Sequence, residues 1–154
     1  MTRQQEIRFV AESALGKLAK WLRILGFDTI YEPEFSDRSF RDPGRIRLTR
    51  TLKTYRQLGG KSIIFITSDH YPEQIKQVIR ELGITLQDVK PFSRCIRCND
   101  PIHRVDKKSL PGKVPDYIWE THDTFLTCRR CHRIYWPGSH IAHSNQRIKQ
   151  LFDD

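Results

Sequence analysis

The sequence predicts an α/β fold with a central, mostly parallel sheet, followed by a small metal-stabilised module. Short apolar segments alternate with amphipathic segments over residues 7–89, which is typical of a parallel sheet covered by helices. The four cysteines all lie beyond residue 90, in two C-x₂-C pairs. The composition changes after Pro91. We therefore expect one domain over residues 1–91 and a second module with a C-terminal tail over residues 92–154.

The first elements can be assigned from residue pattern and turn residues. Residues 7–12 indicate a strand that ends in Glu12, and Ser13 is suited to cap a helix that Gly26 stops. On this helix, the leucines share one arc. A neighbouring arc carries three cations, Lys17, Lys20 and Arg23.

The later elements follow the same reasoning. The apolar run at 63–66 is typical of a central parallel strand, and residues 84–89 suggest a last, edge strand. The polar stretch before Pro43 suits a short helix at 37–40, and the helical tail at 143–154 is expected to pack back on the body. The remaining segments are expected strands at 27–31 and 45–50 and expected helices at 51–58 and 72–82.

Polar residues follow several of the expected strands. In open parallel sheets, ligands bind beyond the carboxyl ends of the strands. Glu12, Arg50 with Thr51, and Asp69 occupy such positions, and Asp37 lies in the segment between two strands. We therefore expect two or three carboxylates to converge at this edge.

The cysteines Cys95, Cys98, Cys128 and Cys131 have the spacing of a structural zinc site. Two disulfides, an iron–sulfur cluster or a rubredoxin-like iron would use the same residues. The polar N-terminus has no apolar signal-peptide core, so we expect a reducing, cytoplasmic location, where metal is favoured over disulfides. The sequence has no run of about 20 apolar residues, so we expect no membrane span.

The charge of the chain favours an anionic partner. Lys and Arg number 27 against 18 acids, a formal net charge of +9 over 154 residues. RNA or DNA is the leading candidate, and a basic protein without such a partner is the alternative. Basic and aromatic residues are interleaved between Arg129 and Trp136, either to contact nucleic acid or to build a small metal-binding core.

Four motifs, in order along nearly the whole chain, resemble the Mut7-C family of ribonucleases. They are Phe9-Val-Ala-Glu-Ser-Ala-Leu-Gly-Lys-Leu-Ala-Lys-Trp-Leu-Arg-Ile-Leu-Gly-Phe-Asp-Thr29, Arg45-Ile-Arg-Leu-Thr-Arg50, Pro91-Phe-Ser-Arg-Cys-Ile-Arg-Cys-Asn99 and Cys128-Arg-Arg-Cys-His-Arg-Ile-Tyr-Trp-Pro-Gly-Ser-His140. The resemblance implies a PIN-like domain with three α/β/α layers, fused to a zinc ribbon whose ligands are the four cysteines. It also implies metal-dependent endoribonuclease activity.

In the resemblance, Glu12 and Asp37 stand at positions of the family's acids, and Asp69 is the expected substitute for a further acid because it follows a strand. Together these three would hold catalytic Mg²⁺ or Mn²⁺. The expected RNA contacts are Lys17, Lys20, Arg23 and Arg50. Two departures from the family pattern affect this site: Glu12 stands where an aspartate is usual, and Thr51 stands where an acid is usual. The alternative is therefore a catalytically inactive RNA-binding or ribosome-associated protein.

Overall fold

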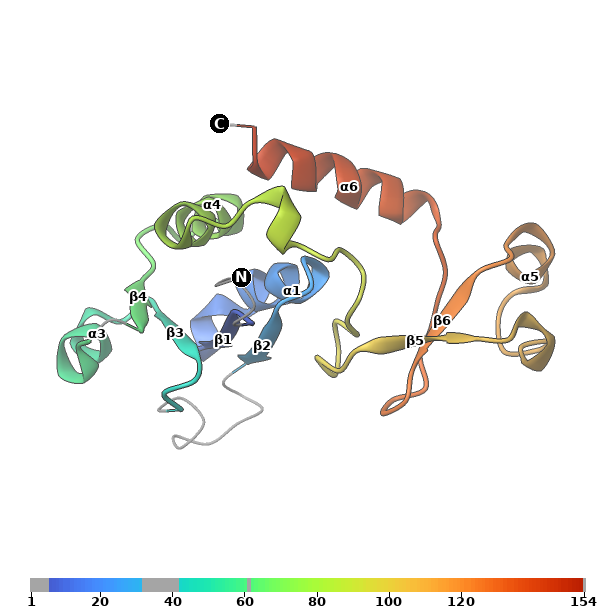
Figure 1. The fold of residues 1–154 in the computed structure, drawn as a ribbon, viewed down its shortest axis with the longest axis horizontal. Helices are drawn as coiled ribbons and strands as arrows, with labels where there is room; N and C mark the ends of the chain where they lie inside the picture. The colour runs from blue at the N-terminus through green and yellow to red at the C-terminus, as the bar shows by residue number, and fades with distance from the viewer. Residues whose placement is uncertain (1–5, 32–41, 61, 154) are drawn as a thin grey trace.

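Four parallel strands form the N-terminal sheet, with bounds Arg8–Ala11 (β1), Asp28–Tyr31 (β2), Ile46–Thr49 (β3) and Ile63–Phe65 (β4). The computed structural model describes residues 6–31, 42–60 and 62–153. The strand order is β2-β1-β3-β4, and Ala11 is paired with Tyr31 on one side and with Leu48 on the other. The predicted parallel sheet is thus confirmed (Figure 1). The expected helix at 37–40 lies outside the described residues.

The helices α1 (Gly16–Ile24), α3 (Leu52–Leu58) and α4 (Tyr71–Leu82) follow β1, β3 and β4. The first begins with a 3₁₀ turn at Ser13–Leu15, for which Glu12, and not Ser13, is the N-cap residue. It ends before Gly26, where φ is +97° and a Cβ atom would lie 2.5 Å from the carbonyl oxygen of Lys90. Only glycine fits that turn. Within the described ranges, none of the helices has the length and apolar character needed to cross a bilayer.

Two expectations about strands are wrong. In the sheet that the described residues form, β4 lies at the edge and is not central. The strand is apolar because other elements bury its two faces; the Tyr55 ring of α3, for example, packs against Phe65. Burial of the faces does not show whether a strand has hydrogen-bonded neighbours on both sides. Residues 84–89 form a 3₁₀ turn, Leu86–Asp88, and no strand. The Asp88 carboxylate accepts from the Thr85 N–H, which favours the turn over an extended strand.

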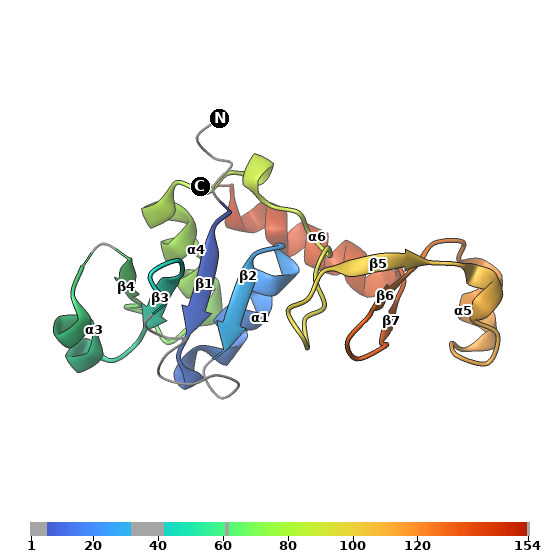
Figure 2. The ribbon, with the colours of Figure 1, turned by 60° about the horizontal axis from the view of Figure 1, so that its bottom comes forward.

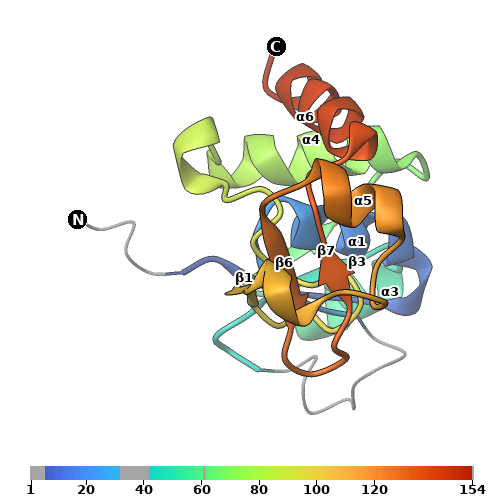
Figure 3. The ribbon, with the colours of Figure 1, turned by 90° about the vertical axis from the view of Figure 1, so that its right-hand side faces the viewer.

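The C-terminal module has its own small sheet and core. The strands β5 (Ile102–Val105), β6 (Phe125–Cys128) and β7 (Ile134–Tyr135) are antiparallel, as Figures 2 and 3 show. A 3₁₀ turn at Lys107–Ser109 and the helix α5 (Asp116–Thr121) connect the first two. Their shared core consists of Leu110, Val114, Ile118 and Phe125.

The last helix, α6 (Ser139–Leu151), returns from this module to the N-terminal part (Figure 1). Ile148 is only 4% exposed and belongs to the main core, and Leu151 and Phe152 pack against that core. The prediction that the tail packs back on the body is confirmed.

The first cysteine pair is fixed directly to the N-terminal sheet. Asn99, which follows Cys98, accepts a hydrogen bond from the Thr29 N–H (2.9 Å) and donates one to Asp28 (2.7 Å). Arg45 donates to the same carboxylate (2.8 Å). Burial alone would raise the pKa of Asp28, but the hydrogen bonds from Arg45 and Asn99 outweigh it and hold that pKa below its ordinary value.

Replacing Asn99 with Ala tests how strongly this contact stabilises the protein. The variant leaves the Thr29 N–H and part of the Asp28 carboxylate without their partner, and it places Ala at a φ of +68°. We expect a loss of about 2–4 kcal/mol in the free energy of unfolding, measured by urea titration.

His132→Ala is the matched control. His132 occupies the equivalent position after the second cysteine pair, also at positive φ (63°), and its exposed side chain forms no hydrogen bond with the described residues. We expect it to cost less than about 1 kcal/mol. Equal losses for the two variants would show that the side-chain contacts of Asn99 do not stabilise the fold.

Candidate functional site

The carboxyl ends of β1, β3 and β4 lie at the same edge of the sheet, because the three strands are parallel (Figure 2). Glu12 follows β1 directly, and Arg50 and Thr51 follow β3. Asp69 lies in the loop between β4 and α4. The structure therefore places these four residues after the strand ends, as the sequence predicts.

Glu12 is held by the end of β3. Its Oε1 atom accepts hydrogen bonds from the Thr49 hydroxyl (2.7 Å) and from the backbone N–H of Arg50. The Thr51 hydroxyl lies 3.4 Å from each carboxylate oxygen. Among the described residues, Oε2 has only this weak contact. One oxygen of Glu12 is thus fully engaged, and the other is available to a ligand.

Asp69 is exposed in a hollow of about 890 Å³ that Lys17 and Glu73 also line. The loop that carries it is fixed by Ser68, whose hydroxyl donates to Glu73 (2.6 Å) and accepts from the His70 N–H (3.0 Å). Asp69 therefore projects from a well-ordered turn at the start of α4. Glu12 does not line this hollow.

The described carboxylates do not form a ready-made three-acid cluster. In the part of the chain that the structure describes, the four cysteines are the only group of three or more acidic, histidine or cysteine side chains placed to hold a metal ion. Asp37, the expected third acid, lies outside the described residues. Glu12 and Asp69 alone represent the predicted site.

The cationic side chains predicted to bind RNA differ in exposure and in their contacts. Lys17 and Lys20 are exposed, and the Lys17 Nζ lies 5.7 Å from the centre of the Tyr71 ring. Arg50 donates to the carbonyl of Ile66 (2.9 Å) and so joins the ends of β3 and β4.

Arg23 does not share the exposed face that the helical pattern gave it. Its side chain is buried, with 5% exposed. The guanidinium donates to the carbonyls of Thr29 and Ile96, each at 2.9 Å, and thereby links α1 and β2 to the first cysteine pair. A cation committed to backbone carbonyls is not available to a phosphate, so we do not retain Arg23 as an RNA contact.

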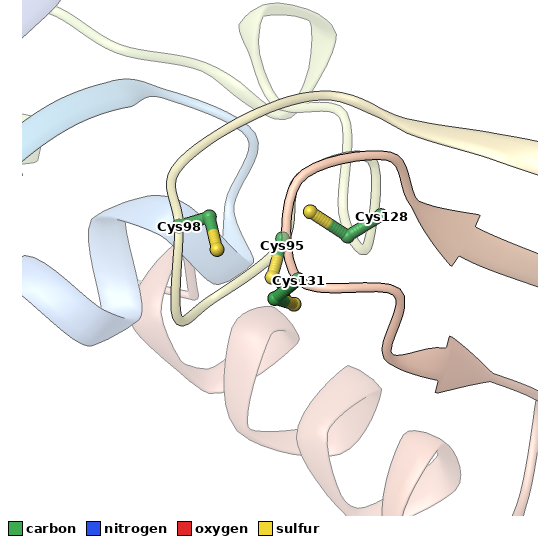
Figure 4. Close-up of side chains that lie close together, drawn as sticks. All are labelled: Cys95, Cys98, Cys128 and Cys131. Atoms are coloured by element: carbon green, nitrogen blue, oxygen red, sulfur yellow. Dashed lines mark hydrogen bonds between the residues drawn. The ribbon is translucent and has the colours of Figure 1, made fainter.

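The four cysteine side chains converge between two neighbouring loops (Figure 4). All four are free, and their sulfur atoms lie within 4.8 Å of one another. The Cys95 and Cys131 sulfurs are 3.7 Å apart. A tetrahedron with Zn–S bonds of about 2.3 Å requires sulfur separations of about 3.8 Å, whereas a disulfide requires about 2.05 Å. The cluster fits a metal ion such as zinc, and the disulfide interpretation is wrong.

The surroundings of Cys95 favour its thiolate. Burial opposes ionisation, but hydrogen bonds from the Tyr135 hydroxyl (3.0 Å) and from the backbone N–H groups of Cys98 and Arg97 outweigh it and lower the pKa of Cys95 to about 7. Burial and the neighbouring thiols raise the pKa of Cys98 to about 12. Four crowded thiolates repel one another unless a cation offsets their charge.

Sequence reasoning missed two supports of this centre. Tyr135 was assigned to packing or stacking, yet its hydroxyl bonds the Cys95 sulfur. Asn99 and His132 follow the two cysteine pairs with φ of 68° and 63°, and their N–H groups donate to the carbonyls of Cys95 and Cys128, both at 2.8 Å. An Asn directly after C-x₂-C was the available signal, because Asn tolerates this conformation.

These features define a class: an α/β protein with acids at the carboxyl edge of a parallel sheet and a four-thiolate centre. The family model described as the Mut7-C RNAse domain matches residues 7–148. The chain therefore belongs to the Mut7-C RNAse domain family, which confirms the resemblance. Comparisons with curated proteins and with solved structures gave no match.

The cysteine cluster predicts one zinc ion per chain, measured by elemental analysis of the purified protein. Cys95→Ser and Cys128→Ser each remove a thiolate ligand. We expect both variants to lose the metal, to unfold the C-terminal module and to lower solubility, because small four-cysteine modules depend on the metal to fold.

Tyr135→Phe is the control for this experiment. It removes the hydroxyl beside Cys95 but keeps all four thiolates, so the metal content should remain one per chain. A soluble, folded Cys95→Ser protein without metal would contradict a structural role. Iron in place of zinc would contradict the identity of the ion.

Proposed function

We propose that this protein is a metal-dependent endoribonuclease with a PIN-like, three-layer α/β/α domain and a structural zinc ribbon. The observation that carries the proposal is the placement of Glu12 and Asp69 at the carboxyl edge of a parallel sheet, in a chain of an RNAse domain family. The layer arrangement is supported by handedness. Right-handed crossovers require α3 to lie on the face of the sheet opposite to α1.

Glu12 and Asp69, with Asp37, would hold Mg²⁺ or Mn²⁺ through carboxylate oxygens. Such an ion, when bound, lowers the pKa of a bound water and offsets charge on the scissile phosphate. The hydrogen bonds of Thr49 and Arg50 to Oε1 hold the Glu12 carboxylate in one orientation and leave Oε2 for a ligand.

The cations bind the substrate in this proposal. Lys17 shares the hollow with Asp69, and its ammonium suits a phosphate next to the scissile bond. Lys20 lies one turn further along α1, where it suits a neighbouring phosphate. Arg50 orders the ends of β3 and β4 around Glu12 through its bond to Ile66.

Glu12→Gln tests the enzyme directly. The substitution keeps the size of the side chain but removes its charge, so we expect Mg²⁺- or Mn²⁺-dependent cleavage of labelled RNA to fall at least ~100-fold. Both structured and single-stranded RNA are offered, with EDTA as the metal-free reference.

Glu120→Gln is the matched control, because it makes the same change on the exposed surface of α5. Its cleavage rate should equal that of the unaltered chain. Cleavage that persists in Glu12→Gln would assign the activity to a contaminant or to other residues.

One observation favours a second candidate, an RNA-binding protein without hydrolytic activity. Thr51 stands where the family usually has an acid, and its hydroxyl faces both oxygens of Glu12. A hydroxyl there donates to Glu12 but adds no negative charge to a metal site. In this alternative the basic surface binds RNA with an affinity that falls steeply with salt, and no cleavage occurs.

Thr51→Asp separates the two candidates without requiring the natural substrate. The new carboxylate lies beside Glu12, so the two charges repel unless a cation lies between them. We expect the melting temperature of Thr51→Asp to rise by several degrees with Mn²⁺, clearly more than that of the unaltered chain, and metal-dependent cleavage to increase.

Thr51→Asn is the control for Thr51→Asp, because asparagine has the shape of aspartate but carries no charge. It should show no added response to Mn²⁺. If Thr51→Asp also shows no added response, the edge of the sheet does not bind a divalent cation, and the RNA-binding candidate is favoured.

A further inference from the structure

A groove of about 670 Å³ runs between α1, the C-terminal module and α6. Its volume lies within the ~300–1,000 Å³ of typical ligand sites. Aromatic side chains form both walls, Trp21 and Tyr71 on the side of the sheet and Tyr135 and Trp136 on the other. The rings of Trp21 and Tyr71 stack at 6.2 Å with an interplanar angle of 13°. Trp21 is only 9% exposed, so the half-buried Tyr71 ring offers more of this wall to a ligand.

The charges along this groove are all positive. Lys17, Lys20, Arg94 and Arg147 line it, and no carboxylate is among its described lining residues. Arg94 is largely committed to the carbonyls of Gly26 and Asn99, and it also pairs with the Glu6 carboxylate (3.2 Å), so it adds little free charge to the groove. Arg147 is positioned by a hydrogen bond to the Tyr71 hydroxyl (2.6 Å), which sets a cation directly beside the aromatic wall.

The groove adjoins the hollow that contains Asp69. Lys17 and Tyr71 line both the groove and the hollow that contains Asp69. A polyanionic strand with one phosphate at Lys17 can therefore pass from the edge of the sheet into the groove. Lys20 and Arg147 also line the groove.

We propose that this groove binds an unpaired nucleotide of single-stranded RNA, with its base against the aromatic walls and its phosphates at Lys17, Lys20 and Arg147. Aromatic walls stack on bases of any sequence, and lysine and arginine neutralise the strand. Bases within a duplex are stacked and cannot enter such a groove. The inference rests on the proposed ribonuclease function and adds to it a preference for unpaired RNA.

The test compares two oligonucleotides on the full, zinc-loaded chain without added Mg²⁺ or Mn²⁺. One is a fluorescein-labelled single-stranded RNA of about 12 nucleotides, and the other has the same backbone with abasic riboses in place of the bases. Because the phosphates are identical, any difference in anisotropy-derived affinity reports on the bases. We expect the RNA to bind about tenfold more tightly or better.

Two variants of α6 test whether this difference in affinity arises in the groove. Ser144→Trp adds an indole to a side chain that lines the groove and should abolish the preference for bases. Asn145→Trp adds the same indole to an exposed neighbour that does not line the groove, and it should keep the preference. Equal affinity of the unaltered chain for both oligonucleotides, or an unchanged preference in Ser144→Trp, overturns the inference.

A second measurement does not depend on whether Ser144→Trp folds. RNA that carries 5-iodouridine is cross-linked to the unaltered chain, and the attached peptides are identified by mass spectrometry. Adducts at Tyr71, Tyr135 or Trp136 support the groove, and adducts confined to other residues overturn it.

The outcomes also separate this inference from the nuclease proposal. Base-dependent binding without metal-dependent cleavage supports the groove and contradicts the nuclease. Cleavage that depends on Glu12 without base-dependent binding supports the nuclease and overturns the groove. Binding of a protein or a lipid that Ser144→Trp blocks, with RNA affinity unchanged, likewise overturns it.

Discussion

The first cysteine pair is attached to β2, at the edge of the sheet. This contact positions the C-terminal module against the N-terminal sheet. Asn99 bonds the backbone of Thr29 as a further strand would, and the same side chain reaches Asp28. Arg23 adds bonds from α1 to the loop that carries Cys95 and Cys98. The loop that carries Cys95 and Cys98 is therefore bonded directly to β2 and α1.

A consequence of this attachment is that the cysteine cluster has a structural effect beyond its own module. The cluster joins the loop fixed to β2 with the turn between β6 and β7. The turn between β6 and β7 leads directly to Tyr135 and Trp136, which lie across the groove from α1. α6 then closes the arrangement, since Ile148 is buried in the main core at its far end. The groove exists because three separate constraints hold its walls apart at a fixed distance.

The edge of the sheet places Glu12 beside the end of β3 and beside Thr51. The end of β3 supplies two donors to Glu12, the hydroxyl of Thr49 and the N–H of Arg50, and these depend only on the strand pairing. Thr51 adds a third donor where an acid would add charge. Three donors thus face the Glu12 carboxylate at this edge, two of them on Oε1.

The sequence by itself determined most of the local structure and the four members of the cysteine cluster. Helical periodicity and glycine stops define α1 and α4, alternation defines β3, and the C-x₂-C spacing identifies all four thiolates. These features are local, so short-range sterics and hydrogen bonding specify them. The sequence also predicted that Glu12 and Asp69 lie at the carboxyl edge of the sheet. That prediction needs only the positions of the strand ends and the parallel direction of the strands.

Only the tertiary structure decided which side chains meet across the chain. By its position on the helix Arg23 is expected to be exposed like Lys17 and Lys20. Its guanidinium instead donates to carbonyls 73 and 74 residues further along the chain. Residues 84–89 have a strand-like composition, but the backbone that follows bonds the end of α1 through Lys90 and Phe92. β4 is apolar on its faces, but within the described residues it has a sheet neighbour, β3, on one side alone. Such outcomes depend on packing between distant segments, which a local pattern does not contain.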